Sequence, residues 1–345
     1  TLSLGTRYSY FMNFGPATVR YYRPEFVRDE SAVLSEEVFG ANQLINTYDG
    51  FEPRIGIRHS LNETASFKVG YNLMRQYLQV VTNATTPLPT SRWKTSDPNI
   101  KPQISQLWTV GYFKNFYGNI YEMSLEGYLR HTQNILDYKP GANFILENFV
   151  ETQLLQGRSR ASGVELMVAR KKGELTGWVS YTYSRVLNQI NEGPNFNERI
   201  NGGRWYPSNF DRPHSFNLSF TVSPNKWHTF SFTFTYASGR PFTAPTGLLR
   251  DGDRLLPYFS ARNNDRIKDY HRLDFSWHIH NPRDKQGKWR GDWIVTIFNV
   301  LGRRNQYSVF LQPYEQSFRT YELTILNAPF VSLTYNFWNE VKPKL

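Results

Sequence analysis

Nine residues near the end of the chain, PFVSLTYNF at positions 329–337, decide the fold class. From Val331 to Phe337, apolar and polar side chains alternate without interruption. A period of two residues is typical of a β-strand with one apolar face and one polar face. The apolar face ends in two aromatic side chains, Tyr335 and Phe337. Because the same pattern recurs along the chain, the sequence predicts an all-β protein.

About twelve stretches carry this pattern, and they are longer than the roughly five or six residues usual for strands in soluble proteins. The last two stretches are expected to be single long strands, the first of them bent near Gly302 and the second with a break at 327–329. The predicted strands cover residues 2–13, 51–60, 64–81, 103–114, 119–138, 151–170, 174–188, 213–223, 230–236, 270–280, 292–312 and 317–337.

The connections between these strands alternate between long and short. Transmembrane β-barrels have brief periplasmic turns and longer extracellular loops. We therefore expect the long connections outside the cell and the short ones in the periplasm. The first long connection could include a short helix at 25–38, and residues 338–345 are expected to form a periplasmic tail after a barrel that covers 1–337. The expected extracellular loops lie near 14–49, 82–102, 139–150, 189–210 and 239–268.

The composition favours a membrane barrel over a soluble sandwich. Aromatic residues make up 16% of the chain, although hydrophobic residues make up only 39%. A barrel strand shows only half of its residues to lipid, and girdles of aromatic side chains lie at both interfaces. No apolar run approaches the roughly 18 residues of a membrane helix. The opposite strand faces carry charges such as Glu122, Glu126, Arg130 and Glu165, which a dry core would have to pair and a watery lumen would not.

The chain is basic and contains no cysteine. Its formal charge is +11 and its isoelectric point is about 9.6. The basic residues are spread over the connections instead of forming a patch or a helical stripe, so nucleic-acid binding is not predicted. Attraction to anionic lipid, including lipopolysaccharide, or to an acidic ligand is the favoured interpretation. The absence of cysteine excludes disulfides, thiolate zinc sites and cysteine nucleophiles.

Eight short segments, in this order, resemble a known family. Between residues 96 and 337 the chain is similar to the C-terminal half of the barrel of TonB-dependent outer-membrane receptors, in the form found in Bacteroidetes bacteria. Each segment alone is a weak signal, whereas the ordered set is specific. The segments are 96–112 (SDPNIKP leading into QLWTVGY), 157–166 (GRSRASGVEL), 175–185 (LTGWVSYTYSR), 205–214 (WYPSNFDRPH), 237–242 (ASGRPF), 269–275 (DYHRLDF), 297–305 (IFNVLGRRN) and 333–337 (LTYNF).

The resemblance implies a barrel of 22 strands, of which these would be the last twelve, around a plug. It implies import of an iron–siderophore complex, haem, cobalamin, a glycan or a peptide, with energy from TonB acting through a plug that the sequence does not show. Further implied partners are a surface lipoprotein and the barrel-assembly machinery, which would read the aromatic pattern of Tyr335 and Phe337. The tail at 338–345 departs from the family, whose chains usually stop near the final aromatic residue.

Candidate site residues are few. His278 and His280 lie two residues apart on one strand face, together with Asp274. Such residues bind a metal when their nitrogen and oxygen atoms converge, but ordinary lumen polarity explains them as well, so no metal site or cofactor is predicted. Arg240 and residues 250–254 lie in an expected outer loop and could contact an anionic ligand, although solvated loop charge is the simpler interpretation. His278, His280, Asp274 and Arg240 are therefore kept as weak ligand-binding candidates.

Other functions remain open at this point. The sequence contains no P-loop, no dinucleotide-binding fingerprint and no catalytic constellation, so an enzyme is not predicted. A small passive pore of about twelve strands, or a scaffold subunit that reuses the barrel within an outer-membrane complex, are the alternatives to import. A soluble all-β binding protein is a further alternative, and it would stay in solution without detergent.

Overall fold

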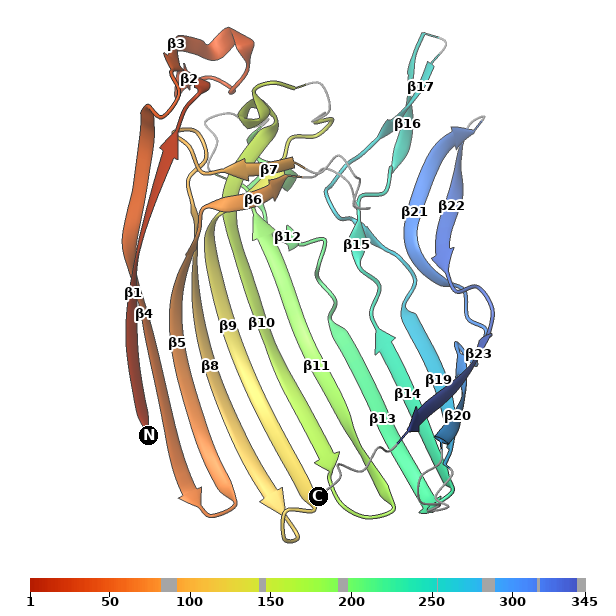
Figure 1. Cartoon of the computed structure of the whole chain (residues 1–345). Coiled ribbons are helices and arrows are strands. Elements are labelled where there is room, and N and C mark those ends of the chain that lie inside the picture. The colour runs from red at the N-terminus through yellow and green to blue at the C-terminus, as the bar shows by residue number, and fades with distance from the viewer. Residues whose placement is uncertain are drawn as a thin grey trace.

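A computed structural model describes residues 1–81, 92–142, 147–191, 198–252, 254–280, 289–314 and 317–339. Twelve long strands form one continuous antiparallel sheet in which each pairs with the next long strand along the chain (Figure 1). A thirteenth, β12 (Tyr206–Pro207), pairs with β11. The long strands are β1 (Leu2–Phe14), β4 (Leu44–Asn62), β5 (Ala65–Gln76), β8 (Gln103–Phe116), β9 (Tyr121–Tyr138), β10 (Leu154–Arg170), β11 (Leu175–Gln189), β13 (His214–Asn225), β14 (His228–Ala237), β19 (Tyr270–Ile279), β20 (Trp289–Phe298) and β23 (Phe330–Asn339).

The sheet has an apolar face and a polar face, as the alternation predicts. On the apolar face, Phe232 stacks on Phe220 with ring centroids 4.8 Å apart and contacts Phe275 at 5.0 Å. On the polar face, the hydroxyls of Thr221 and Ser231 lie 3.0 Å apart across the same two strands. Cross-strand pairs of these kinds stabilise a sheet and fix its register. The predicted all-β antiparallel fold is thereby confirmed.

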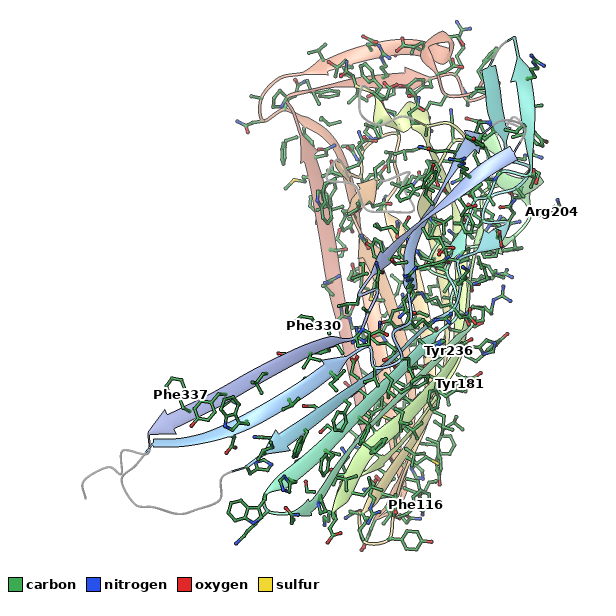
Figure 2. All side chains as sticks on the ribbon, turned by 90° about the vertical axis from the view of Figure 1, so that its right-hand side faces the viewer. Phe116, Tyr181, Arg204, Tyr236, Phe330 and Phe337 are labelled. Atoms are coloured by element: carbon green, nitrogen blue, oxygen red, sulfur yellow. The ribbon has the colours of Figure 1, made fainter. Side chains whose placement is uncertain are left out.

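The two ends of the sheet differ, and Figure 1 shows them at the bottom and the top. At the bottom, here called the short-turn end, a few residues join β4 to β5, β8 to β9, β10 to β11 and β13 to β14. At the top, the long-loop end, the connections fold into small hairpins. Figure 2 places Phe116 at the short-turn end and Arg204 among the long connections. The hairpin strands are β2 (Ala17–Tyr22) with β3 (Val33–Phe39), β6 (Leu78–Val81) with β7 (Arg92–Thr95), β15 (Pro241–Phe242) with β18 (Asp265–Arg266), and β16 (Gly247–Asp251) with β17 (Arg254–Tyr258).

The expected helix at 25–38 is wrong. Only one helical turn forms there, η1 (Glu30–Ala32), capped by the Asp29 carboxylate, which accepts from the Ser31 amide. Residue 33 then starts β3, which pairs with β2. The described part of the chain contains two other short 3₁₀ helices, η2 (Val150–Gln153) and η4 (Ile200–Gly203). Within the described residues, no helix is long and apolar enough to cross a membrane.

The last two predicted strands are each divided into two, which corrects the expectation of single strands at 292–312 and 317–337. The expected break at 327–329 does lie between β22 and β23. β20 and β23 belong to the large sheet, whereas β21 (Asn305–Tyr314) and β22 (Ser317–Ile325) form a separate hairpin. The break follows from Asn299, which adopts a left-handed backbone with φ of 52°. Its side-chain amide donates to the carbonyls of Arg303, between β20 and β21, and of Leu326, between β22 and β23. One buried residue therefore fixes the backbone at both breaks.

Buried hydrophobic clusters lie beneath the long connections. One contains Val81, Ile100, Ala142, Val150 and Leu154, which come from two connections and the start of β10. A second cluster contains Ile135, Leu155, Ile190, Ile200 and Tyr206. These side chains pack the long connections onto the end of the sheet. Loops without such buried side chains usually run over the surface with their backbone exposed to water. Parts of the expected loops (82–91, 143–146, 192–197 and 253) and residues 340–345 of the expected tail lie outside the described residues.

Candidate functional site

Two adjoining grooves run along the polar face of the sheet. The first has a volume of about 730 Å³ and is lined by side chains from β8 to β11 and from the segment after β12. The second has a volume of about 580 Å³ and is lined by β1, β4, β5 and β8. Thr109 and Glu126 line both grooves. The polar face therefore carries one continuous depression across seven strands, and ligand sites are typically concave surfaces of this kind.

The walls of this depression carry charge of both signs. Glu126 and Glu165 face each other in the register of β9 and β10, and Arg130 lies on the same wall. Arg54 and Lys68 line the second groove. Mixed charge of this density suits a hydrated surface, because unpaired charges would be costly in a dry core. The predicted ladder of Glu122, Glu126 and Arg130 lies on this face, where the Glu122 carboxylate also pairs with the Lys171 ammonium at 3.1 Å.

A buried carboxylate lies next to Val186 and Phe210, which line the first groove. The Asp211 side chain is fully buried. It accepts hydrogen bonds from the Arg266 guanidinium, from Arg185 at 3.3 Å and from the Val186 amide at 2.6 Å. Arg266 also donates to the backbone carbonyls of Asp211 and Gly239. One ion-pair network thus fixes the segments before β13, after β14 and before β19 relative to β11.

A second network joins the same level of the sheet to the connections. The Tyr206 hydroxyl and the Arg262 guanidinium both donate to the Asp137 carboxylate, the latter at 2.9 Å. Arg262 also lies over the Tyr138 ring, 3.9 Å from its centroid. Burial raises the pKa of the Tyr206 hydroxyl above its ordinary range, and the adjacent Asp137 charge adds to this effect. Tyr206 therefore stays protonated and acts as a hydrogen-bond donor.

The first long connection is fastened to three others. The Arg20 guanidinium on β2 stacks on the Phe149 ring, 3.4 Å from its centroid, and the Arg20 carbonyl accepts from the Asn99 side chain at 2.9 Å. The Arg28 amide donates to the Glu198 carboxylate at 3.2 Å, and the Lys139 ammonium donates to the Arg28 carbonyl at 2.9 Å. Burial lowers the pKa of Lys139. The β2–β3 hairpin is thereby held over the long-loop end of the sheet (Figure 1).

The structure brings two of the predicted site residues together and separates the third. His278 and His280 converge on Asp292 of β20, with the His278 Nε2 atom 3.0 Å from Asp292 Oδ2. Asp274 instead pairs with Arg272 at 2.9 Å and accepts from the Asn299 amide at 2.8 Å. Asp274 therefore holds the break after β20 and does not belong to the histidine cluster.

Arg240 and the terminal aromatic residues occupy defined places. Arg240 donates to the Tyr307 carbonyl at 2.6 Å, and burial lowers the pKa of its guanidinium. The β16–β17 hairpin carries Arg250, which donates to the Gly252 carbonyl. On the apolar face of β23, the centroids of the Tyr335 and Trp293 rings lie 4.7 Å apart. Phe337 lies further along β23, toward its C-terminal end (Figure 2).

The buried networks around Asp211 and Asp137 are not predicted from the sequence. A signal was present for Asp211, because it lies within the segment WYPSNFDRPH at 205–214. A single aspartate in a polar segment does not reveal which arginine it meets, since Arg266 lies 55 residues away. Asp137 carried no comparable signal, as the pattern of β9 places it at an ordinary strand end.

Comparison with known proteins supports the same architecture. A family profile described as TonB dependent receptor-like, beta-barrel matches residues 1–323. No curated protein sequence matches the chain. Among solved structures, the siderophore receptor PiuA from Acinetobacter baumannii is 14% identical with a TM-score of 0.59, and the match covers 98% of this chain and 40% of that one.

Other solved structures share the fold at similar identity. The ferric-catecholate import receptor Fiu from E. coli K12 is 13% identical with a TM-score of 0.57, covering 98% of this chain and 42% of that one. The FrpB iron transporter from Neisseria meningitidis is 11% identical with a TM-score of 0.55, and the match covers 98% of this chain and 43% of that one. The chain thus spans less than half the length of these structures, and at such identities they show the fold alone.

TonB-dependent receptors are outer-membrane transporters and not enzymes, and the open twelve-strand sheet with its polar and apolar faces is part of such a barrel. The apolar face is then the lipid-facing surface and the polar face lines the lumen. By the match of the family profile over nearly its whole length, the chain belongs to the TonB-dependent receptor-like β-barrel family.

Proposed function

We propose that this chain is the C-terminal barrel part of a receptor that imports a ligand across the outer membrane with energy from TonB. The observation that carries the proposal is the continuous depression of the lumen wall beneath connections that are already fastened to one another. A passive pore needs no such fixed outer surface, whereas a receptor needs one, because a preorganised surface loses less entropy when it binds.

The charge of the whole chain is the argument for the ligand class. The wall of the second groove carries the cations Arg54 and Lys68 together with Glu126, and the whole chain carries a formal charge of +11. An anionic ligand is therefore favoured over a neutral one. A ferric catecholate complex is anionic, and similar structures include a ferric-catecholate import receptor. Haem, cobalamin, a glycan and a peptide are the other candidates.

The proposed orientation places the long-loop end outside the cell and the short-turn end in the periplasm, as is general for outer-membrane barrels. The twelve strands would then be the last twelve of a 22-stranded barrel. Tyr335 and Phe337, at the end of β23, would present the aromatic pattern to the barrel-assembly machinery. The outer connections would meet lipopolysaccharide and, in a larger assembly, a surface lipoprotein. TonB would act through a plug within the complete barrel.

Uptake in cells tests the proposal. Cells that express the full-length protein are supplied with ⁵⁵Fe bound to a catecholate siderophore, and accumulation is compared with that of cells lacking either the receptor or TonB. We expect accumulation that requires both proteins. Labelled cobalamin, haem, glycan and peptide are tested in the same way. Uptake that continues without TonB supports a passive pore, and the absence of uptake for every ligand class supports a scaffold subunit.

A further inference from the structure

A compact group of metal-ligating side chains lies at the short-turn end of the polar face. His278 lies on β19, His280 follows directly after that strand, and Asp292 lies on β20. Residues two apart on a strand point to the same face. The register pairs Ile279 with Trp293, so His280 lies opposite Asp292 and His278 lies diagonal to it. Strand geometry alone therefore brings two imidazoles and one carboxylate to one place.

The distances between the potential ligand atoms fit a bound cation. Asp292 Oδ2 lies 3.0 Å from His278 Nε2 and 3.4 Å from His280 Nδ1. The three ligand atoms all lie within 4.8 Å of one another. Two ligands that each lie about 2.0–2.2 Å from a tetrahedral zinc ion are separated by roughly 3.3–3.6 Å. The side chains could therefore close on a cation by small rotations without movement of the strands.

Thr229, outside the three ligand residues, orients the His280 ring. The Nε2 atom of His280 lies 2.9 Å from the Thr229 hydroxyl of β14. Its backbone amide donates to the Trp227 carbonyl at 2.7 Å, which fixes the chain at this point. Metal-binding histidines commonly use their other ring nitrogen in such a contact, which sets the tautomer and the ring orientation. With Nε2 engaged by Thr229, the Nδ1 lone pair of His280 is the one left for a cation beside Asp292.

The group is shielded but accessible. About a third of each histidine side chain is exposed, at 30%, whereas the Asp292 side chain is 12% exposed. The exposure of the histidines leaves a route for a hydrated ion and room for water as a fourth ligand. The carboxylate of Asp292 is less exposed and lies in an environment of lower dielectric constant. The pairing of β19 with β20 is also short here, from Phe275–Ile297 to Ile279–Trp293. A cation bound between the two strands would join them where backbone pairing ends.

We propose that His278, His280 and Asp292 bind one divalent transition-metal ion at the short-turn end of the lumen wall. Two imidazole nitrogens and one carboxylate oxygen favour Zn²⁺, Ni²⁺, Cu²⁺ or Fe²⁺ over Mg²⁺ and Ca²⁺, which prefer oxygen ligands. The site lies at the opposite end of the sheet from the fastened connections, and its test does not measure import. It is therefore independent of the function proposed above.

Zinc binding by the purified full-length receptor in detergent tests the site. The protein is stripped with a chelator, and Zn²⁺ affinity is measured in competition with a chromophoric chelator. We expect one bound Zn²⁺ that His278→Asn or Asp292→Asn weakens by about 100-fold or more, and that Thr229→Val weakens by about 10- to 100-fold. His271→Asn is the matched control, because His271 lies on the same strand outside the cluster. It should bind Zn²⁺ like the wild type.

A second measurement needs no variant. Zn²⁺ should protect His278 and His280 of the wild-type protein from modification by diethyl pyrocarbonate, mapped by mass spectrometry, and leave the modification of His271 unchanged. The folded state of every variant is checked by its heat-modifiable migration on a gel. The proposal is overturned if the wild type takes up no Zn²⁺, if the variants bind it as the wild type does, or if Zn²⁺ protects neither histidine of the cluster.

Discussion

At the scale of single residues, the two faces of one strand differ sharply in the solvent they meet. Phe232 lies on the apolar face of β14 between Phe220 and Phe275. Its neighbour Thr233 lies on the polar face, 3.5 Å from the Ser219 hydroxyl and opposite Asp274 in the register. An added charge should therefore be costly at Phe232 and nearly without effect at Thr233.

Phe232→Arg should lower the free energy of unfolding by about 2–4 kcal/mol, the usual cost of a cation on the lipid face near the bilayer midplane. Thr233→Arg should change it little, because the added guanidinium reaches water and the Asp274 carboxylate. Denaturant unfolding of the full-length protein in lipid vesicles measures both values. Equal costs at the two positions would contradict the assignment of the faces.

The buried Asp211 carboxylate makes a second prediction at this scale. Asp211→Ala removes the acceptor of two guanidinium groups and of the Val186 amide. Breaking a buried ion pair costs about 3–5 kcal/mol. Since a third of the Arg266 side chain is exposed, at 33%, we expect the lower end of that range. Urea unfolding measures the change.

The matched control for Asp211 is an exposed ion pair. Glu122 and Lys171 are 42% and 53% exposed, and such pairs contribute about 0–1 kcal/mol. Glu122→Ala should therefore leave the unfolding midpoint nearly unchanged. If both alanine variants had the same small effect, the Asp211 network would not be what holds the segments around β13 and β19 to β11.

At the scale of elements, several of the short segments that resemble the receptor family lie where the sheet is hydrogen-bonded to its connections. Asn299 in the segment 297–305 ends β20, and Asp274 in the segment 269–275 accepts its amide. Asn305 exchanges hydrogen bonds with the backbone of His271. Ser238 in the segment 237–242 donates its amide to the His214 carbonyl. Each of these residues acts on backbone that is distant in sequence.

The long strands and several of their ends could be predicted, whereas the end of β20 could not, for a physical reason. The alternation of side chains is a local property, so β14 and the strand from Phe330 are evident in the sequence. The ending of β20 depends on hydrogen bonds from Asn299 to Leu326 across 27 residues. No local pattern encodes such a bond. The partner of the two histidines was missed likewise, because Asp292 meets them only through the pairing of β19 with β20.

Gly239 gives a prediction for the junction after β14. A Cβ atom at this position would lie 1.7 Å from the Ile267 carbonyl oxygen, whereas one at Gly247 would meet no atom within 4 Å. Gly239→Ala must therefore push residue 239, just before β15, away from Ile267, just after β18, although β15 and β18 pair with each other. We expect a loss of about 1–3 kcal/mol or more and a smaller heat-modifiable fraction after refolding. Gly247→Ala should refold like the wild type, and the reverse order would refute this close approach.

At the scale of the whole molecule, the long connections and the sheet form one body with a fixed upper surface. The first connection contributes the Arg20–Phe149 stack, which links it to the third connection. The ion pairs of Arg20 with Glu30 and Glu36 lie within the first connection itself, and both glutamates are well exposed. Exposed pairs contribute little. The stack should therefore hold the β2–β3 hairpin to its neighbours more than these ion pairs do, together with the hydrogen bonds that Asn99, Glu198 and Lys139 make with this connection.

Arg20→Gln should loosen this hairpin without unfolding the barrel. A cation–π contact of this closeness contributes about 1–2 kcal/mol, so amides at 17–39 should exchange with deuterium roughly tenfold faster, because local opening becomes easier by that free energy. Exchange in β9 and β10 should not change. Arg23→Gln is the control, since Arg23 lies over Phe26 within the same connection at 5.9 Å. Faster exchange across the whole sheet, or none at the hairpin, would show that the upper surface is held by other contacts. A selective effect at the hairpin would mean that this connection opens by itself while the lumen wall stays intact.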